Sequence, residues 1–501
     1  MFMRKKVIII GAGIAGLSAG CYLQMNGYDT EIFEMSHLPG GLCRSWKRQD
    51  YTFDGCLHWL VGSSPTVELY DLWEELIEMK NIQFVDHEEF MRIQDRDGKY
   101  ISIFTDAERL EKEMLTKAPS DKKIIMKFTR AIRKYARFKL PLSKPIEIFN
   151  LRDGLRFMFD FFPYLFDFYL WQRLSARKWA LKCKNRLLKK TFEWMFMTDM
   201  SILFMIFNLA WMHKKGAGYP IGGSQLITDR LTGRYLQLGG KIHYSSKATK
   251  VITEHNKAGG IVLADGTLHQ SDIVVSAADG YYTIFEMLEG KYTNHKIKKH
   301  YKDGATFPAH LQVSFGIKRK LDFDFHSIVF ILDQGLVIDD DTTATEMWFR
   351  IYHFDPTLAP EGKTVIEGII PTYHYQYWVE LRKNDPEKYI GEKERIAKAL
   401  IDILEKRLGN IKKHVEVIDV TTPVTVIENT NNWKGAFEGW LITGKMGPLA
   451  MKKYLPGLKD FYMAGHWIET GGGVPNAMRS GRGVAQIICK KDRKKFHTTK
   501  P

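Results

Sequence analysis

The segment from Lys6 to Glu34 constrains the fold more than any other part of the chain. It begins with a β-branched run, Val7 to Ile10, of the kind found in a parallel strand covered on both faces. Three glycines follow with G-x-G-x-x-G spacing, at Gly11, Gly13 and Gly16. In a strand–turn–helix unit the first allows a tight turn, the second lets a pyrophosphate approach the backbone, and the third lets the helix pack closely on the strand. The pattern therefore predicts a dinucleotide-binding unit.

An acidic residue completes this unit. A second apolar strand, Thr30 to Phe33, ends at Glu34, about 20 residues beyond the glycines. A carboxylate at that position accepts hydrogen bonds from the ribose hydroxyls and repels a 2′-phosphate. A glycine-rich turn without a ligand is the alternative interpretation. Because strand, helix, second strand and acidic residue occur in order, we expect a dinucleotide site.

The size of the chain indicates its number of domains, and its net charge indicates the kind of partner it binds. A chain of 501 residues exceeds what one hydrophobic core usually supports, so two connected domains are expected. A net charge of +15 indicates an anionic partner, which could be nucleic acid, an acidic membrane surface or a phosphate-bearing ligand. The sequence contains no nucleic-acid-binding motif, so we expect no nucleic-acid partner.

The cysteines and the apolar segments indicate a cytoplasmic location. The five cysteines have no C-x-x-C spacing, so we expect neither a metal site nor a disulfide framework, and a reducing compartment fits. The basic and then apolar N-terminus resembles a signal peptide, but the glycine turn explains it better. The most apolar segment, Met195 to Met212, is interrupted by Asp199 and Asn208, so no membrane span is expected.

A second glycine turn narrows the choice of nucleotide. Gly40 and Gly41 follow Glu34, and Arg44 comes next, where a second loop can meet the pyrophosphate. This arrangement resembles the FAD-binding end of the flavin amine oxidase and phytoene desaturase superfamily. Phe53-Asp54-Gly55 resembles the F-D-x-G segment of the phytoene desaturases.

Later segments extend the resemblance. Tyr219-Pro220-x-Gly222-Gly223-Ser224 and the strand Ile273 to Ser276 resemble nucleotide-fold blocks of the same family, and Trp433 to Ala436 with Gly439-Trp440 resembles a block of its bacterial and archaeal members. The C-terminal glycines Gly471 to Gly473 precede a helix expected over Asn476 to Ile488, whose positive end would lie beside the flavin pyrimidine.

The resemblance implies an α/β fold with a Rossmann-like FAD-binding domain of the glutathione-reductase and amine-oxidase type and a mixed-sheet substrate domain. We expect a discontinuous FAD-binding domain over 1–85, 217–300 and 424–495, a helical insert over 86–216, and a substrate-binding domain over 301–423. It also implies non-covalent FAD, since no cysteine lies between Gly465 and Gly483. The implied FAD-binding residues are Gly11, Gly13, Ile14, Ala15, Gly16, Glu34, Gly40, Gly41, Leu42, Arg44, Ala248, Ala277, Gly465, Gly472, Gly473, Val474 and Asn476.

In such an enzyme the flavin carries the hydride chemistry, and two side chains are candidates for assisting it. His58 follows the F-D-x-G segment, and a structural histidine beside Trp59 is the alternative. Glu469 stands with Thr470 where some desaturases carry His-Pro. It is a candidate general acid or base, and an ion-paired glutamate is the alternative.

The insert indicates contact with a membrane. Ile125, Phe128, Ile132 and Tyr135 recur at helical spacing, while Lys123, Lys127, Arg130, Lys134 and Arg137 recur on another face. The segment Phe157 to Trp171 is rich in aromatic residues and precedes a basic cluster. Such helices either lie on an anionic membrane surface or cap the protein core.

We therefore predict an FAD-dependent oxidoreductase that adds or removes hydrogen at carbon–carbon bonds of an apolar, carotenoid-like lipid. Desaturation, saturation and isomerisation remain open, and the electron acceptor or donor is not encoded in any motif. An amine oxidase is one alternative, because it shares the nucleotide-binding segments. A prenyl-protein or prenyl-lipid binding protein that does not use flavin is another, but such proteins have degenerate cofactor glycines, which are complete here.

Overall fold

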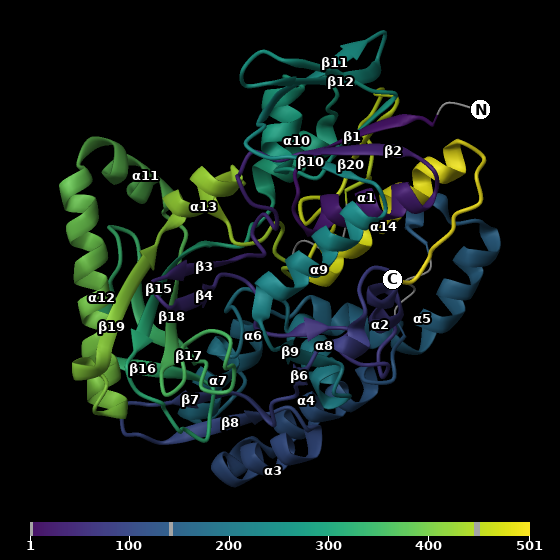
Figure 1. Ribbon diagram of the computed structural model, residues 1–501. Coiled ribbons are helices and arrows are strands. Elements are labelled where there is room, and N and C mark those ends of the chain that lie inside the picture. Colours follow the sequence, from purple (N-terminus) through teal and green to yellow (C-terminus); the bar gives the residue numbers. More distant parts are fainter. Residues whose placement is uncertain (1–3, 140–143, 445–450) are drawn as a thin grey trace.

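The computed structural model describes residues 4–139, 144–444 and 451–501 (Figure 1). Its first sheet is parallel and has the strand order β10-β2-β1-β14-β20. The strands are β1 (Lys6–Ile10), β2 (Asp29–Phe33), β10 (Lys241–His243), β14 (Ile273–Ser276) and β20 (Phe461–Met463). Three distant parts of the chain thus form one sheet. The β-branched side chains of β1 are buried, as expected for a central parallel strand.

Three helices pack together beside this sheet. Helix α1 (Ile14–Met25) contacts both α9 (Gly223–Gln237) and α14 (Val474–Lys491). The crossing of α1 and α14 is close because of Gly481, where a Cβ would collide with the backbone of Ala15 and Ala19. The C-terminal helix is therefore anchored to the first helix of the chain.

A small antiparallel sheet lies at the top of the molecule in Figure 1. It contains β11 (Ala248–Glu254), β12 (Lys257–Leu263) and β13 (Leu268–Gln270), and β12 and β13 form a hairpin with its turn at Asp265-Gly266. Side chains of this sheet, such as Val251 and Ile261, share one apolar cluster with Ile8 and Val274 of the parallel sheet. The small sheet thus covers the parallel sheet.

The second large sheet has seven strands in the order β19-β15-β18-β17-β16-β7-β8. They are β7 (Glu89–Gln94), β8 (Tyr100–Phe104), β15 (Ala309–Ile317), β16 (Ser327–Val337), β17 (Thr343–Ile351), β18 (Thr364–Thr372) and β19 (Val415–Thr421). Helices α11 (Tyr375–Asn384), α12 (Pro386–Leu408) and α13 (Pro423–Thr430) lie beside it (Figure 1). The pairing is antiparallel except between β16 and β7. The predicted α/β fold class, with a parallel nucleotide sheet and a mixed second sheet, is confirmed.

The expected helical insert differs from the structure in its first part. Residues 89–104 form β7 and β8, which extend the second sheet, so the helices begin only at Ala107. Phe90, Met91 and Ile93 of β7 are buried together with Ile101 and Ile103 of β8. Strands this short do not give a periodic signal that separates them from helix, and their partner β16 lies more than two hundred residues away.

Most of the remaining helices lie below the nucleotide sheet in Figure 1. They are α3 (Ala107–Lys117), α4 (Lys122–Tyr135), α5 (Leu151–Gln172), α6 (Ala176–Ala180), α7 (Arg186–Trp194) and α8 (Ile202–His213). None of the helices in the described ranges has the length and apolar character needed to span a bilayer. Helix α8 packs on α4 and α5, and most of its apolar side chains are buried.

Short elements link these layers. They are β3 (Ser45–Arg48), β4 (Tyr51–Asp54), β5 (Leu60–Val61), β6 (Phe84–Val85), β9 (Ala217–Pro220), α2 (Leu69–Glu74) and α10 (His295–Asp303). The β3–β4 hairpin is antiparallel, and β9 pairs with both β5 and β6. Asp54, the last residue of β4, is hydrogen-bonded both to Glu367 of β18 in the second sheet and to Ser224 of α9, the helix that packs on α1.

Candidate functional site

The two glycine turns predicted to hold a pyrophosphate lie against each other. Gly13 and Gly40 form an isolated parallel bridge, and the backbone N–H of Gly40 donates to the Ala12 carbonyl at 2.9 Å. A Cβ at Gly41 would lie 3.3 Å from the Cα of Gly13. Gly16 has its expected packing role, because a Cβ there would collide with the carbonyl oxygen of Gly11. The two turns form a cradle of backbone next to the N-terminus of α1, where anions bind favourably.

Glu34 and Arg44 lie at the side of this cradle. Glu34 is only 5% exposed, and its carboxylate accepts hydrogen bonds from the N–H groups of Ala12 (2.7 Å) and Ser36 (2.8 Å). The pKa of Glu34 lies above its ordinary value because burial is the largest effect, although these N–H groups and the Arg44 guanidinium act in the opposite direction. The Nε of Arg44 is buried and has no hydrogen-bond partner within the described chain. A phosphate or ribose oxygen would give that donor a partner, so these residues fit a dinucleotide.

A third glycine turn joins the cradle from the C-terminal end of the chain. Gly465, Gly472 and Gly473 have φ angles of 112°, 59° and 83°, which favour glycine. The Asn476 side chain donates to the Gly472 carbonyl at 2.8 Å and fixes the turn that opens α14 at Val474. A Cβ at Gly465 would lie 3.7 Å from that of Ala15 on α1. The N-termini of α1 and α14 therefore belong to the same site.

The other predicted FAD residues lie around this cradle. A Cβ at Gly11 would lie 3.2 Å from the Ala277 carbonyl oxygen, so Ala277 is adjacent to the first turn. Ala248 is the first residue of β11, two residues after Ser246, whose N–H donates to the Glu34 carbonyl at 2.7 Å. Ile14 begins α1, and Leu42 is half-buried in the second glycine turn. The structure brings the predicted cofactor residues together from four parts of the sequence.

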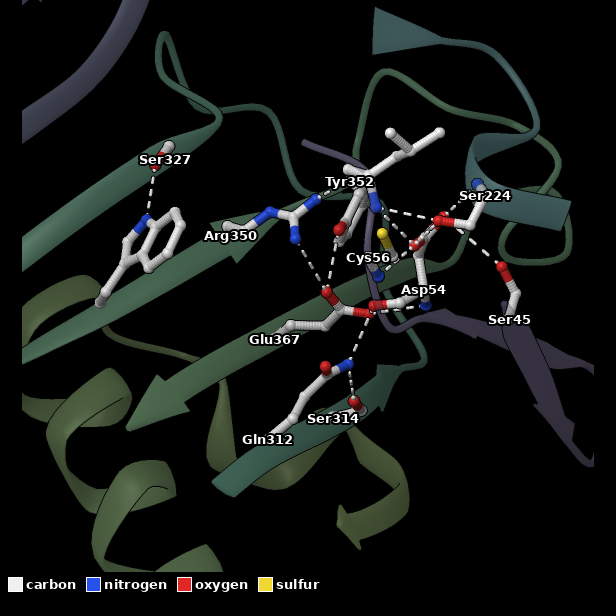
Figure 2. A network of polar contacts seen from close by, with 12 residues as sticks. Ser45, Asp54, Cys56, Ser224, Gln312, Ser314, Ser327, Arg350, Tyr352 and Glu367 are labelled. Carbon is white, nitrogen blue, oxygen red and sulfur yellow. Dashed lines mark hydrogen bonds and ion pairs between the residues drawn. The ribbon is translucent and has the colours of Figure 1, made fainter. Parts of the chain in front are cut away.

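A buried polar network holds the loop after β4 in place (Figure 2). The Asp54 carboxylate accepts hydrogen bonds from the N–H groups of Cys56 (2.9 Å), Leu57 (3.1 Å) and Ser224 (2.6 Å). The Asp54 N–H in turn donates to Glu367 on β18 at 2.9 Å. A Cβ at Gly223 would collide with Asp54, so a glycine is required at this contact. The network fixes the predicted F-D-x-G segment between the two large sheets.

The second sheet contributes further partners to this network. The Tyr352 hydroxyl donates to Glu367 at 2.8 Å, and Arg350 donates to the Leu57 carbonyl at 2.9 Å (Figure 2). Burial raises the pKa of Glu367 to about 7. The carbonyl of Leu57 and the N–H groups after Asp54 are thereby satisfied, which fixes the backbone leading to His58.

His58 is half-buried beside aromatic rings. Its ring lies 4.9 Å from that of Trp348 and 5.8 Å from that of Trp59, both with edge-to-face geometry. Burial lowers the pKa of His58 well below its ordinary value, and the charge of Arg350 acts in the same direction. The imidazole is therefore neutral at physiological pH, and it borders a small cavity together with Phe90 and Trp348.

Glu469, the second candidate, is held in a buried ion pair. It contacts Lys453 at 2.5 Å and Arg479 at 3.2 Å. Although burial raises its pKa, the two cations hold the pKa of Glu469 below its ordinary value. These contacts favour the ion-paired alternative, because a carboxylate with two cationic partners is a poor proton acceptor near neutral pH.

Sequence reasoning missed Glu438, which lies at the turn before α14. A Cβ at Gly472 would collide with the Glu438 carboxylate. Burial raises the pKa of Glu438 to about 8, although the N–H of Gly473 lowers it. The sequence signal was its place between Ala436 and Gly439, inside the block that resembles desaturase-like proteins.

Comparison with known proteins gives one matching family model, described as flavin-containing amine oxidoreductase, over residues 14–489. The 4,4'-diapophytoene desaturase (4,4'-diapolycopene-forming) of Methylomonas sp is 24% identical over 98% of this chain and 96% of its own length. The chloroplastic prolycopene isomerase of Arabidopsis thaliana is 25% identical over 83% of this chain and 71% of its own length.

Among solved structures, an oxidoreductase from Methanosarcina mazei superposes with a TM-score of 0.61 at 17% identity. The alignment covers 96% of this chain and all of that one. At this identity the similarity supports the fold, and it agrees with the two-sheet architecture described above. The match of the family model over residues 14–489 confirms the family resemblance expected from the glycine turns.

Proposed function

Since the chain belongs to the flavin-containing amine oxidoreductase family and is an FAD-dependent oxidoreductase, we propose that it transfers hydrogen at carbon–carbon bonds of an apolar, carotenoid-like lipid. The observation that carries the proposal is the convergence of three glycine turns and Glu34 on one site, in a chain whose full-length relatives include a diapophytoene desaturase. The bound FAD would accept or supply the hydride.

The proposed cofactor contacts follow from the geometry of the cradle. Gly13, Gly41 and the N-terminus of α1 would bind the pyrophosphate, with Arg44 as a cationic partner. Glu34 would accept from the ribose hydroxyls. The turn at Gly472 and the N-terminus of α14 would lie at the ring end, where the helix dipole stabilises negative charge.

An aromatic cluster near His58 supports an apolar substrate. Trp59 contacts Phe90 with ring centroids 5.3 Å apart and Phe196 at 6.1 Å, and Phe196 contacts Phe204 of α8 at 5.8 Å. The cluster thus extends from the helical layer to the loop fixed by Asp54. Aromatic faces of this kind suit a flat polyene, whose binding needs large apolar contact area.

A membrane surface is proposed as the source of the lipid. Helix α5 exposes large apolar side chains, among them Phe159 (81%), Phe162 (73%) and Phe166 (73%). An exposed basic cluster follows α5, formed by Arg173, Arg177, Lys178, Lys182, Lys184 and Arg186. An apolar helix face next to exposed cations fits an anionic lipid surface, on which the protein would lie peripherally. This surface is called the α5 face below.

Isomerisation is the second candidate reaction, because one relative is a prolycopene isomerase. The two reactions differ in whether the lipid transfers electrons to the flavin, which desaturation requires and isomerisation does not. We would incubate FAD-loaded protein anaerobically with phytoene in anionic vesicles and identify the products by chromatography and mass. A loss of two hydrogens per turnover supports desaturation, and an isomer of unchanged mass supports isomerisation.

Two glycine variants, one at the cofactor site and one matched control elsewhere, test the role of the turn before α14 in this assay. Gly472 and Gly457 both have left-handed backbones, with φ of 59° and 76°. A Cβ at Gly457 meets open space, whereas one at Gly472 meets Glu438. Gly472→Ala should therefore lose FAD and turnover together, while Gly457→Ala keeps both. Turnover of amines in place of polyenes would contradict the proposed substrate.

A further inference from the structure

Glu438 supports a further inference, which rests on the FAD binding proposed above. Backbone hydrogen bonds fix the segment that carries it. Phe437 donates to the Pro308 carbonyl at 3.2 Å and Leu441 to the Ala305 carbonyl at 2.9 Å. On the other side, the N–H of Gly471 donates to the Trp440 carbonyl at 3.2 Å. Glu438 is therefore held against the turn that opens α14.

The carboxyl group of Glu438 fills the space left by a missing side chain. A Cβ at Gly472 would meet its Oε2 and Cδ atoms, and the N–H of Gly473 faces the carboxyl. Gly472 and Gly473 are residues proposed to lie at the flavin ring. An acid at this position contacts the part of the site where reduction places negative charge.

No cationic side chain among the described residues pairs with Glu438. Phe437 packs on Phe307, with ring centroids 5.2 Å apart. From the loop after β4, the titratable group that interacts with Glu438 is the thiol of Cys56. A hydrogen bond with Cys43, together with burial, raises the pKa of Cys56 well above its ordinary value, so this thiol is neutral. Within the part of the chain that the structure describes, Glu438 thus lacks cationic partners like those that hold Glu469 ionised, and burial raises its pKa to about 8.

We propose that Glu438 takes up a proton when the flavin is reduced and releases it when the flavin is reoxidised. In desaturation above a pH of about 8, where Glu438 is ionised, its carboxylate would accept the proton of one carbon–hydrogen bond, and bound FAD would accept the hydride of the C–H bond on the adjacent carbon. The products would be a carbon–carbon double bond, the reduced flavin and a carboxylic acid. The substrate loses two electrons and the flavin gains them. Saturation is the same step in reverse.

The test measures the midpoint potential of the flavin against pH in FAD-loaded, full-length protein without any lipid. Formation of the anionic reduced flavin consumes one proton. Above a pH of about 8, Glu438 is ionised before reduction, and the new negative charge raises its pKa so that it binds a second proton. The slope of potential against pH in wild type should therefore be about twice that of Glu438→Gln.

Two further variants serve as controls for the change at Glu438. Glu438→Asp keeps a titratable carboxyl and should retain the steeper slope. Glu428→Gln, at an exposed position of α13, should match wild type. Equal slopes for wild type and Glu438→Gln would overturn the inference, whereas a wild-type protein that binds no FAD would overturn the proposed function.

An infrared measurement keeps the inference testable if Glu438→Gln fails to retain FAD. The reduced-minus-oxidised difference spectrum of wild type above a pH of about 8 should gain the C=O band of a protonated carboxylic acid. Absence of that band in FAD-loaded wild type would overturn the inference.

Discussion

Helices α4 and α5 both carry aromatic and basic residues and are close in sequence, yet they differ in which side chains reach solvent. Ile125, Phe128 and Ile132 of α4 are fully buried, and Phe128 packs edge-to-face on Phe192 at 5.0 Å. By contrast, Phe159 and Phe162 of α5 are largely exposed. The apolar face of α4 therefore caps the core, which is the second of the two alternatives that the sequence left open for this helix.

The cations of α4 also differ from those near α5. Lys134 pairs with Asp167 of α5 at 2.5 Å, and Lys127 lies 5.3 Å from the ring of Trp171. Cations of α4 thus hold α5 in place, while α5 turns its outer side chains to solvent. Periodicity identifies two faces of a helix, but the neighbours of the helix decide which face is buried.

The largest difference expected between variants of α4 and of α5 is in the free energy of unfolding. Phe128→Ala removes a fully buried ring and should lower the free energy of unfolding by about 3 to 5 kcal/mol. Phe159→Ala, at a side chain that is 81% exposed, should change it by less than about 0.5 kcal/mol. Denaturant titration of both variants measures the difference. Equal losses would contradict the assignment of α4 to the core and α5 to the surface.

The next effect is on membrane binding. Changing Phe159, Phe162 and Phe166 together to Ser should weaken binding to anionic vesicles roughly a hundredfold, because inserting three such rings contributes about 3 kcal/mol even when their burial is partial. Vesicle co-sedimentation at low salt measures this affinity. Unchanged sedimentation of the triple variant would exclude the α5 face as the membrane contact.

The smallest effect concerns the exposed cations of α4. Changing Lys123 and Arg130 to Gln should weaken vesicle binding less than about thirtyfold, since each cation near an anionic surface contributes about 1 kcal/mol at most. Salt should reduce that contribution further. If this double variant lost binding as completely as the α5 triple variant, the membrane contact would have to include α4.

The nucleotide end of the molecule could be predicted because its constraints are local. Gly11, Gly13 and Gly16 are required by the turn and by helix packing within one strand–helix unit, and Glu34 follows in the next strand. The meeting of the Gly40–Gly41 turn with this unit was also expected from the resemblance. Because these steric requirements involve residues that are close in sequence, they can be recognised in the sequence as a pattern of glycines.

Other features depend on partners that lie far away in the sequence. Strands β7 and β8 become part of the second sheet only through pairing with β16, and nothing within residues 89–104 encodes that partner. Glu469 is ionised because Lys453 and Arg479 lie next to it. Glu438 is recognised as a candidate site residue only from the fold, which places its carboxyl group against Gly472. Long-range packing thus decided the roles of the acidic residues.

The measurement that tests the central claim most directly is the flavin absorbance after rapid anaerobic mixing of FAD-loaded protein with phytoene in anionic vesicles. Hydrogen removal from the lipid should bleach the oxidised flavin in a single turnover, with one double bond formed per flavin reduced. The Gly457→Ala variant should behave as wild type. A flavin that is reduced by amines and not by any polyene, or that responds to neither, would contradict the account.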